Sequence, residues 1–418
     1  MPLRAAPQSY RPRVRQGLWL ASMRYRAARG AVYGRRMTNQ LDHAAPTDFV
    51  QRATALIPRL RERAREIETT RFLPSEIMAA LQEAGLLRLG VPREYGGYES
   101  DPMTFLRVCE ELATADASTA WCVFIHVTST LALTALPQAK AKAMMADPKT
   151  VFSGVFAPRG QASIAGDDYV IRGRWAWGSG IRHAHWVSVG CMLRSEGAPA
   201  RVTVFVPADR VRILDTWEVS GLCGTGSNDF VIEDYRAPAE HVAGPTLSCF
   251  ADRPLYRFPR FGLLSSPIAA ICLGLARAAI RELTTLAAAK VPDGTTRSLA
   301  SRASTQIEVA SAEAALRSAH AYFDQSIEAA HRAALHGEPT TSDRLHVRLA
   351  TTHTVKTCAD IVRSMYELAG GSALYSSAPI QRIFRDVHAA TQHMMVSTAT
   401  LELTGRLLLG VETDTTML

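Results

Sequence analysis

The stretch DYVIRGRWAWGSGIRHAHWVSVGCML, residues 168–193, contains two runs rich in β-branched and aromatic residues, separated by a glycine-containing turn. Runs of this composition are typical of β-strands. Similar short runs lie on either side of it, from TVFSGVF (150–156) to DFVIEDYRAP (229–238), with Gly, Asp and Pro between them. We therefore predict a small all-β domain over residues 149–250, folded as a sandwich or a barrel.

Both flanks of this β region have the pattern of helices. In DFVQRATALIPRLRERAREIE from residue 48 and SPIAAICLGLARAAIRELTTLAAAK from residue 266, apolar residues recur every three or four positions. Without βαβ alternation, a Rossmann fold is disfavoured. The sequence predicts an α+β fold that is mostly α: an N-terminal helical domain (42–148), the middle β domain, and a C-terminal four-helix bundle (251–418).

The net charge of +8 arises from the N-terminus. Residues 1–36 hold nine Arg and no Lys, Asp or Glu, so residues 37–418 carry 8 − 9 = −1. A near-neutral body offers no basic face, and we expect no nucleic-acid partner. Residues 1–41 are expected to be a disordered basic leader, with a targeting peptide or a nucleic-acid arm as the alternatives.

Composition also bears on location and metal binding. The longest apolar stretch, residues 261–276, is interrupted by Ser, Pro and Gly. It falls short of the ~20 residues of a membrane span, so we expect a buried helix and no membrane partner. Seven scattered Cys without a C-x-x-C motif favour a reducing cytoplasm. His183 and His185 have no neighbouring acidic or Cys ligand, so no metal site is predicted.

The first candidate for chemistry lies in the quoted stretch. Trp175, Trp177 and Ser179 alternate along the chain, so in a regular strand all three point to one face. An indole beside a hydroxyl suits a flat heteroaromatic ring, since the indole packs on the ring and the hydroxyl bonds a ring nitrogen. The competing interpretation is two core tryptophans of a β domain.

Further candidates lie near the C-terminus and before the β region. Gly370-Gly371 follows a predicted helix and permits either a helix cap or close approach to a ligand. Arg385-Asp386 is expected to open a helix, and His388 and His393 are five residues apart, so at most one faces a given pocket. Ser153 stands at the entry to the β domain.

The order and spacing of these motifs resemble the acyl-CoA dehydrogenase superfamily from about residue 48 to residue 409. The resemblance is closest to the oxygenase components of two-component flavin monooxygenases, the group of 4-hydroxyphenylacetate and steroid-phenol hydroxylases. The segments that carry it are LGVPREYGGYE (89–99), ASTAW (117–121), FAPRG (156–160), GRWAWGSG (173–180), WEVSGLCGTGSND (217–229) and APIQRIFRDVHA (378–389).

The resemblance implies a function. Reduced FMN or FAD, supplied by a separate flavin reductase, would react with dioxygen through a C4a-hydroperoxyflavin and hydroxylate an aromatic or heteroatom-containing small molecule. It implies catalytic roles for three residues. Ser179 matches the hydroxyl that bonds flavin N5, Ser153 matches a pocket serine, and His393 matches the histidine on the C4a side.

It also implies the flavin-binding surface and the assembly. Trp177 matches the residue packed near the isoalloxazine, and Gly370 and Gly371 match a turn that approaches the flavin of a neighbouring subunit. A homotetramer is expected through the C-terminal bundle. Some relatives carry a pocket histidine where this chain has Ser129, and His126 lies one helical turn earlier. Either residue could serve that pocket, and the substrate class stays open among phenols, polycyclic aromatics, indoles, amines and sulfur heterocycles.

Two other functions are weighed. An acyl-CoA dehydrogenase needs a carboxylate base, and the stretch ATQHMMVST after the Arg-Asp pair (390–398) contains no acid. Glu367 is the remaining candidate for that base. A non-catalytic protein that retains the fold is the second alternative, because a fold does not fix a function.

Overall fold

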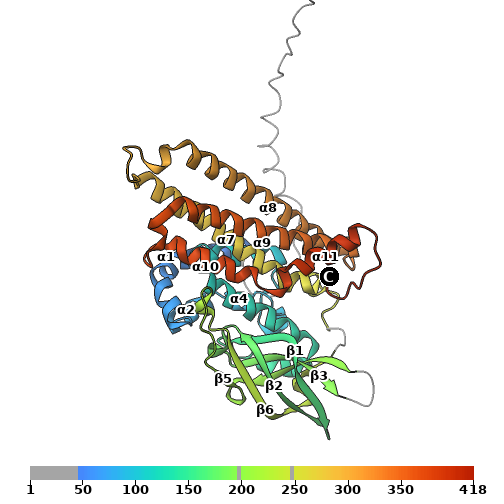
Figure 1. Cartoon of the computed structure of the whole chain (residues 1–418). Helices are drawn as coiled ribbons and strands as arrows, with labels where there is room; N and C mark the ends of the chain where they lie inside the picture. Colours follow the sequence, from blue (N-terminus) through green and yellow to red (C-terminus); the bar gives the residue numbers. More distant parts are fainter. Residues whose placement is uncertain (1–45, 195–198, 245–248) are drawn as a thin grey trace, which may run out of the picture. The chain divides into compact units, whose positions relative to one another are not determined.

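The computed structural model describes residues 46–194, 199–244 and 249–418. The predicted leader, residues 1–41, lies outside these ranges. The described residues form one compact unit. Along the chain, helices precede and follow a single β-sheet, which confirms the predicted α+β, mostly helical fold (Figure 1). The division of this unit into three domains stays a prediction.

The N-terminal helices begin at recognisable signals. Asp101 and Asp116 precede two of them, and their carboxylates accept hydrogen bonds from the amides of Thr104 (3.0 Å) and Thr119 (2.7 Å). Such N-caps satisfy amides that have no partner within the helix. The helices are α1 (Pro46–Thr70), α2 (Ser75–Glu83), α3 (Pro102–Ala113), α4 (Ala117–Thr130) and α5 (Gln138–Met144).

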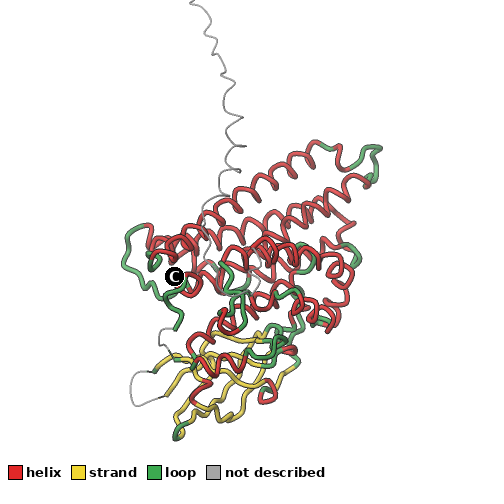
Figure 2. Tube along the Cα trace, turned by 180° about the vertical axis from the view of Figure 1, so that it is seen from behind, coloured by secondary structure: helices red, strands yellow, loops and turns green. Residues whose placement is uncertain are grey.

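The β region is one seven-stranded mixed sheet in the order β5-β6-β2-β1-β3-β4-β7. The central strand β1 pairs antiparallel with β2 and parallel with β3. Figure 2 shows the strands gathered on one side of the helices. The strands are β1 (Phe152–Ala165), β2 (Asp168–Gly178), β3 (Trp186–Arg194), β4 (Ala200–Pro207), β5 (Arg212–Leu214), β6 (Asn228–Pro238) and β7 (Val242–Ala243).

The C-terminal part is built on three long helices that pack side by side. These are α7 (Arg260–Ala289), α8 (Ala303–His336) and α9 (Thr341–Ala369), joined by the shorter α6 (Pro254–Arg257), α10 (Pro379–Thr391) and α11 (Thr398–Leu408). The prediction that Arg385-Asp386 opens a helix is wrong, because α10 begins at Pro379. Proline favours the first helical turn, since it has no amide hydrogen that needs a partner there.

Two helical segments are long and apolar enough to cross a membrane. They are Ala117–Ala135 and Arg260–Ala289, and 72% and 89% of their apolar windows are buried inside the structure. Burial of this extent is what the core helices of a folded protein have. The helix expected over residues 261–276 is the first half of α7.

Helix α4 joins the two layers. It packs against α3 and α7 on the helical side and against β1 of the sheet. Apolar residues surround it on nearly all sides, as an interior helix requires. The residues of α4 therefore reach both the sheet and the C-terminal helices, and the functional residues described below cluster around it.

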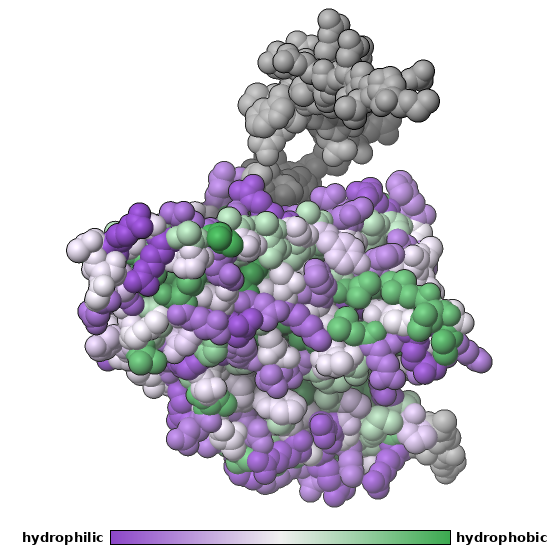
Figure 3. Space-filling model, turned by 45° about the horizontal axis from the view of Figure 1, so that its top comes forward, coloured by the Kyte–Doolittle hydropathy of each residue, from purple (hydrophilic) through white to green (hydrophobic). Residues whose placement is uncertain are grey.

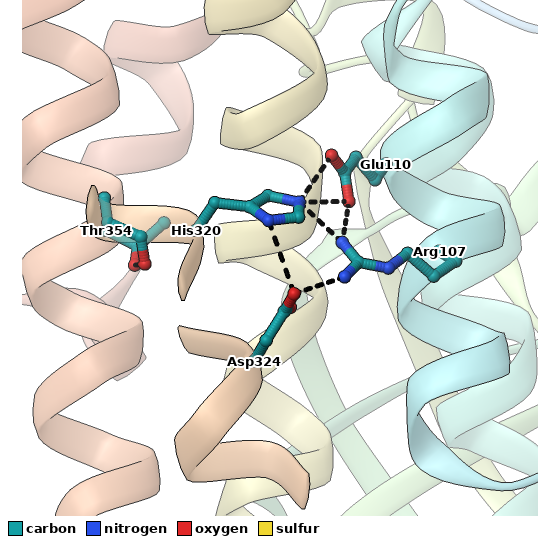
Figure 4. A network of polar contacts seen from close by, with 6 residues as sticks. Arg107, Glu110, His320, Asp324 and Thr354 are labelled. Carbon is teal, nitrogen blue, oxygen red and sulfur yellow. Dashed lines mark hydrogen bonds and ion pairs between the residues drawn. The ribbon is translucent and has the colours of Figure 1, made fainter. Parts of the chain in front are cut away.

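A charged cluster joins α3 to α8. Arg107 donates to Glu110 at 2.6 Å and to Asp324, and His320 Nε2 lies 3.0 Å from Glu110 Oε1 (Figure 4). Burial alone would raise the pKa of Glu110, but His320 and Arg107 outweigh it and lower that pKa. Burial raises the pKa of Asp324 despite Arg107. We call these four residues the ionic cluster.

Candidate active site

The end of strand β2 turns two tryptophans in different directions. Trp175 is fully buried, stacks on Phe230 with ring centroids 5.5 Å apart, and donates from Nε1 to the Gly190 carbonyl at 2.9 Å. Trp177 has a backbone φ of +67° and is 65% exposed. The prediction that Trp175, Trp177 and Ser179 share one face is therefore wrong.

The reason is local backbone strain. A left-handed φ costs a residue other than glycine about 1–2 kcal/mol, and such strain concentrates at functional sites. At Trp177 it breaks the alternation of the strand, so the indole faces outward while Ser179, two residues later, is buried. Trp175 follows the competing interpretation of a core tryptophan, and Trp177 does not.

Ser153 and Ser179 are brought together, although 26 residues separate them. The Ser153 hydroxyl donates to the Ser179 carbonyl at 2.8 Å, which fixes the backbone of the turn after β2. The Ser179 hydroxyl lies 2.6 Å from the hydroxyl of Ser227. Both sequence-predicted serines are buried, so a hydroxyl here faces little competition from bulk water.

His126 supports this turn from α4. Its Nδ1 accepts a hydrogen bond from the amide of Phe152 at 2.9 Å, one residue before Ser153. Burial lowers the pKa of His126 to about 4, against smaller opposing effects of the Leu87 and Phe152 backbone. The imidazole is therefore neutral at physiological pH, and it holds the start of β1.

A small pocket lies between α2, α4 and the turn after β2. His126, Ser179 and His183 contribute polar groups to its wall. Burial lowers the pKa of His183 to about 4 as well. The remaining lining residues are apolar or weakly polar, namely Met78, Leu81, Leu87, Cys122, Val151, Phe152 and Gly180. The wall is therefore uncharged near neutral pH.

His183 and His185 have different surroundings. His183 belongs to a short 3-10 helix, and the Nδ1 of His185 accepts from the Val151 amide at 3.0 Å. Within the part of the chain that the structure describes, no group of three or more His, Cys, Asp or Glu side chains is arranged to hold a metal ion.

Ser129 lies on the other side of the β1 entry. A Cβ on Gly154 would come within 3.1 Å of the Ser129 hydroxyl and 2.0 Å of the Ser188 hydroxyl. Only glycine allows α4 and β3 to approach β1 this closely. The Ser129 hydroxyl therefore lies beside Gly154, the residue after Ser153. His126 instead bonds the amide of Phe152, the residue before Ser153.

His393 reaches the same helix from the C-terminal side. Its ring lies edge-on to Trp121 of α4 with centroids 5.8 Å apart, and its Nδ1 accepts from the Met395 amide at 3.2 Å. Burial, followed by the charge of Arg348, lowers the pKa of His393 to about 4. His388, in contrast, packs on Phe384 with ring centroids 4.4 Å apart.

The two glycines and Glu367 lie at the exposed end of α9. Gly370 has a φ of +56°, and a Cβ on Gly371 would meet no atom within 4 Å among the residues that the structure describes. Glu367 is exposed and pairs with Arg363 at 3.1 Å. Among the described residues, no hydrogen bond joins Gly370 or Gly371 to the Ser153–Ser179 pair. The Trp177 carbonyl accepts from the Ser179 amide at 2.9 Å, but the Trp177 indole faces away from the buried serines.

Sequence reasoning missed the roles of three residues that continue the polar network from Ser179. Ser227 and Thr225 continue the line of hydroxyls from Ser179, with 2.7 Å between them. The buried carboxylate of Asp386 accepts from the Leu222 amide at 2.6 Å and so holds this loop. Burial raises the pKa of Asp386 to about 7. Their only signal in the sequence was their place in segments already chosen for the resemblance.

Comparison with known proteins assigns the class. Residues 48–144 match the model of the acyl-CoA dehydrogenase N-terminal domain, and residues 266–398 match that of the C-terminal domain. The chain belongs to the acyl-CoA dehydrogenase family. The 3-HSA hydroxylase of Rhodococcus sp. RHA1 superposes with a TM-score of 0.81 at 28% identity, covering 89% of this chain and 99% of that one.

Curated relatives assign the group within the family. The indole-3-acetate monooxygenase of Pseudomonas putida is 34% identical over 85% of this chain and 92% of its own length. The flavin-dependent monooxygenase oxygenase subunit HsaA of Rhodococcus jostii is 30% identical over 82% and 93%. The chain is the oxygenase component of a two-component flavin-dependent monooxygenase, and its cofactor is reduced flavin with dioxygen as co-substrate.

The residues present fit a flavin. Trp177 offers an exposed flat side chain on a strained backbone, and the buried Ser179 hydroxyl is two residues away. The imidazoles of His126, His183 and His393 are neutral near pH 7. Neutral imidazoles among apolar side chains limit water and stray protons, as flavin-dependent oxygenation requires.

Proposed function

We propose that the protein hydroxylates a small aromatic acid, and that Ser153, Ser179 and His393 form its catalytic centre. The observation that carries the catalytic centre is the Ser153–Ser179 hydrogen bond of 2.8 Å, which fixes the turn carrying the Ser179 hydroxyl. When reduced flavin is bound, the flavin activates dioxygen. The protein residues bind and orient the flavin and substrate, exclude water and control protons.

The resemblance to the family gives each residue a role. The Ser179 hydroxyl bonds flavin N5, and the indole of Trp177 packs near the isoalloxazine. Burial depresses the pKa of His393, so its imidazole is neutral. Because Nδ1 accepts from the Met395 amide, Nε2 carries the hydrogen and would donate it beside the reacting carbon. Ser153 holds the Ser179 backbone, and Ser129, whose hydroxyl lies beside Gly154, would serve the substrate pocket.

The substrate class is supported by an arginine beside an exposed aromatic ring. The guanidinium of Arg260 lies 4.7 Å from the centre of the Phe156 ring, and Phe261 meets that ring edge-on at 6.0 Å. Arg260 has no ion pair among the described residues. Such an arginine suits a carboxylate on an aromatic substrate. Two relatives are named indole-3-acetate monooxygenases, and indole-3-acetate is an aromatic acid.

The assembly that we propose is a homotetramer in the cytoplasm, served by a separate flavin reductase. Large apolar side chains are exposed after α9 and around α11: Leu374, Tyr375, Met394, Leu408 and Leu409. Figure 3 shows apolar side chains gathered on the side of the molecule where α11 lies. Large exposed apolar side chains of this kind support a subunit interface. A neighbouring subunit would bring its flavin to Gly370 and Gly371, around which there is room.

The reaction is tested with purified protein, a flavin reductase, NADH, and FMN or FAD. Indole-3-acetate is the first substrate, and indole, which lacks the carboxylate, is the matched control. We expect one hydroxylated product per NADH with the acid, and at least tenfold lower kcat/KM with indole. Arg260→Gln should remove most of that preference. Peroxide as the only product with every aromatic acid tested would contradict the proposal.

The same preparation separates the two alternatives. A dehydrogenase would bleach bound FAD on addition of an acyl thioester, without dioxygen. A non-catalytic protein would bind neither oxidised nor reduced flavin. Gly371→Ala tests the shared flavin site: it adds one methyl group into open space of the single chain, so weaker flavin binding with an unchanged free energy of unfolding would mean that a neighbouring flavin occupies that space.

A further inference from the structure

Three hydroxyl groups form a continuous line behind the turn after β2. Ser179 Oγ lies 2.6 Å from Ser227 Oγ, and Ser227 Oγ lies 2.7 Å from Thr225 Oγ1. Thr225 Oγ1 then donates to the Leu222 carbonyl at 2.8 Å. All three side chains are at most 5% exposed. We call Ser179, Ser227 and Thr225 the hydroxyl row.

The carbonyl at the end of the row fixes its direction. A hydroxyl has one hydrogen to donate and two lone pairs to accept with, whereas a carbonyl only accepts. Thr225 therefore gives its hydrogen to Leu222, which leaves it as an acceptor for Ser227. Ser227 in turn accepts from Ser179. The hydrogen of the Ser179 hydroxyl thus points along the row, and its free lone pairs point away from it.

The loop that carries the row is held rigidly. The Leu222 amide donates to the buried carboxylate of Asp386 at 2.6 Å. A Cβ on Gly221 would lie 2.3 Å from the Arg385 carbonyl, so the loop and α10 are in close contact. Gly226 has a φ of +52°, which favours glycine at that position. The acceptor at the end of the row is therefore fixed to the C-terminal helices.

We propose that Ser227 and Thr225 are positioning residues that make Ser179 accept a hydrogen bond, so that the site prefers reduced over oxidised flavin. N5 of reduced flavin carries a hydrogen and donates, whereas N5 of oxidised flavin presents a lone pair. A Ser179 oxygen that only accepts stabilises the first and opposes the second. The inference rests on the proposed contact between Ser179 and flavin N5.

The test is the ratio of the dissociation constants for oxidised and anaerobically reduced flavin, measured with FMN and FAD. Ser227→Ala and Thr225→Val free the Ser179 hydroxyl to donate to N5, and each should lower this ratio about tenfold, the value of roughly one hydrogen bond. The midpoint potential of the bound flavin should fall by about 30 mV, which is a tenfold change for a two-electron couple. Ser227→Thr and Thr225→Ser keep the hydroxyls and should keep the ratio.

The outcomes separate the row from the proposed contact. If Ser179→Ala changes the ratio and neither Ser227→Ala nor Thr225→Val does, the row has no such role although the contact with N5 stands. If Ser179→Ala also leaves the ratio unchanged, or the wild-type chain binds no flavin, both ideas are wrong. Two variants at different positions keep the test valid if one of them does not fold, as judged by circular dichroism.

Discussion

The hydroxyl row and the ionic cluster are both polar networks that join distant parts of the chain, yet they are built from opposite chemistry. The row has no charge and is at most 5% exposed, whereas the side chains of the cluster are 22–31% exposed. Burying a charge is costly, so charged networks keep partial access to water. Neutral hydroxyls can be buried completely when each has a partner.

This difference separates a site for chemistry from a site for stability. A fixed charge beside the flavin would favour one protonation state and attract water. The row instead directs one hydrogen bond through neutral groups, and the surrounding histidines are neutral for the same reason. The ionic cluster lies between α3 and α8, where its contacts hold two helices together. The predictions below test this division, beginning with the largest effect in free energy.

The folding stability that depends on the buried neutral histidines should be lost in acid. The pKa of His126 is lowered to about 4 in the folded protein, against about 6.5 in the unfolded chain. Between these values the unfolded chain binds more protons, so stability is full above pH 6.5 and is lost as pH falls toward 4. His126 alone accounts for about 3 kcal/mol of that loss, and His183 and His393 act in the same direction.

Urea unfolding from pH 7 to pH 4.5 measures this loss. His126→Gln is the matched variant, because a glutamine side-chain carbonyl can still accept from the Phe152 amide but does not titrate. We expect a flatter dependence of the free energy of unfolding on pH in this variant. An unchanged slope would mean that the acid sensitivity arises elsewhere, for example in the ionic cluster.

His393 should affect chemistry without affecting folding. Replacing it with alanine removes the imidazole that lies edge-on to Trp121, and loss of a positioned proton-transfer group typically costs about 100-fold in kcat. The amounts of hydroxylated product and of peroxide formed per NADH measure this effect. In the variant, released peroxide should rise as hydroxylation falls. His388→Ala, on the same segment but packed on Phe384, is the control and should retain hydroxylation. Equal losses in both variants would remove His393 from the catalytic centre.

The sequence was informative wherever one local pattern decided the structure. Periodicity predicted helices α1 and α7, the apolar run of residues 261–276 predicted the burial of α7, and the β-prone runs predicted the strands. Trp177 could not be predicted, because alternation assumes a regular strand and a positive φ at a tryptophan is imposed by tertiary contacts. Arg385 was misread because Pro379, the better signal for a helix start, lies six residues earlier.

The site was predictable only in part, for a similar reason. The roles of Ser153, Ser179 and His393 came from the resemblance. In the structure a hydrogen bond joins the two serines, and the His393 ring packs edge-on against Trp121 of α4. The hydroxyl row needed coordinates, because its direction depends on which carbonyl lies at its end. Ser227 and Thr225 are visible in the sequence, but a spacing of two residues does not say where their hydrogens point.

The ionic cluster should affect folding without affecting chemistry. Arg107→Met leaves Glu110 and Asp324 without their shared cation, and we expect a loss of about 2 kcal/mol after allowing for partial exposure. Urea unfolding at pH 7 measures it. Arg317→Met removes an exposed pair with Glu313 and should cost under about 0.5 kcal/mol. A changed preference for reduced flavin in Arg107→Met would show that the two networks are coupled.

Trp177 gives the smallest expected change in stability and the sharpest separation of roles. Trp177→Phe keeps an aromatic ring at the strained position, and the indole that it removes is exposed, so the free energy of unfolding should change by less than about 0.5 kcal/mol. Trp175→Phe removes the hydrogen bond to Gly190 and should cost about 1–3 kcal/mol. Flavin affinity should respond in the opposite order, weakening more for Trp177→Phe, because only the outward indole can meet the isoalloxazine. Equal flavin affinity in both variants would mean that the strain at Trp177 serves the turn to Ser179 alone.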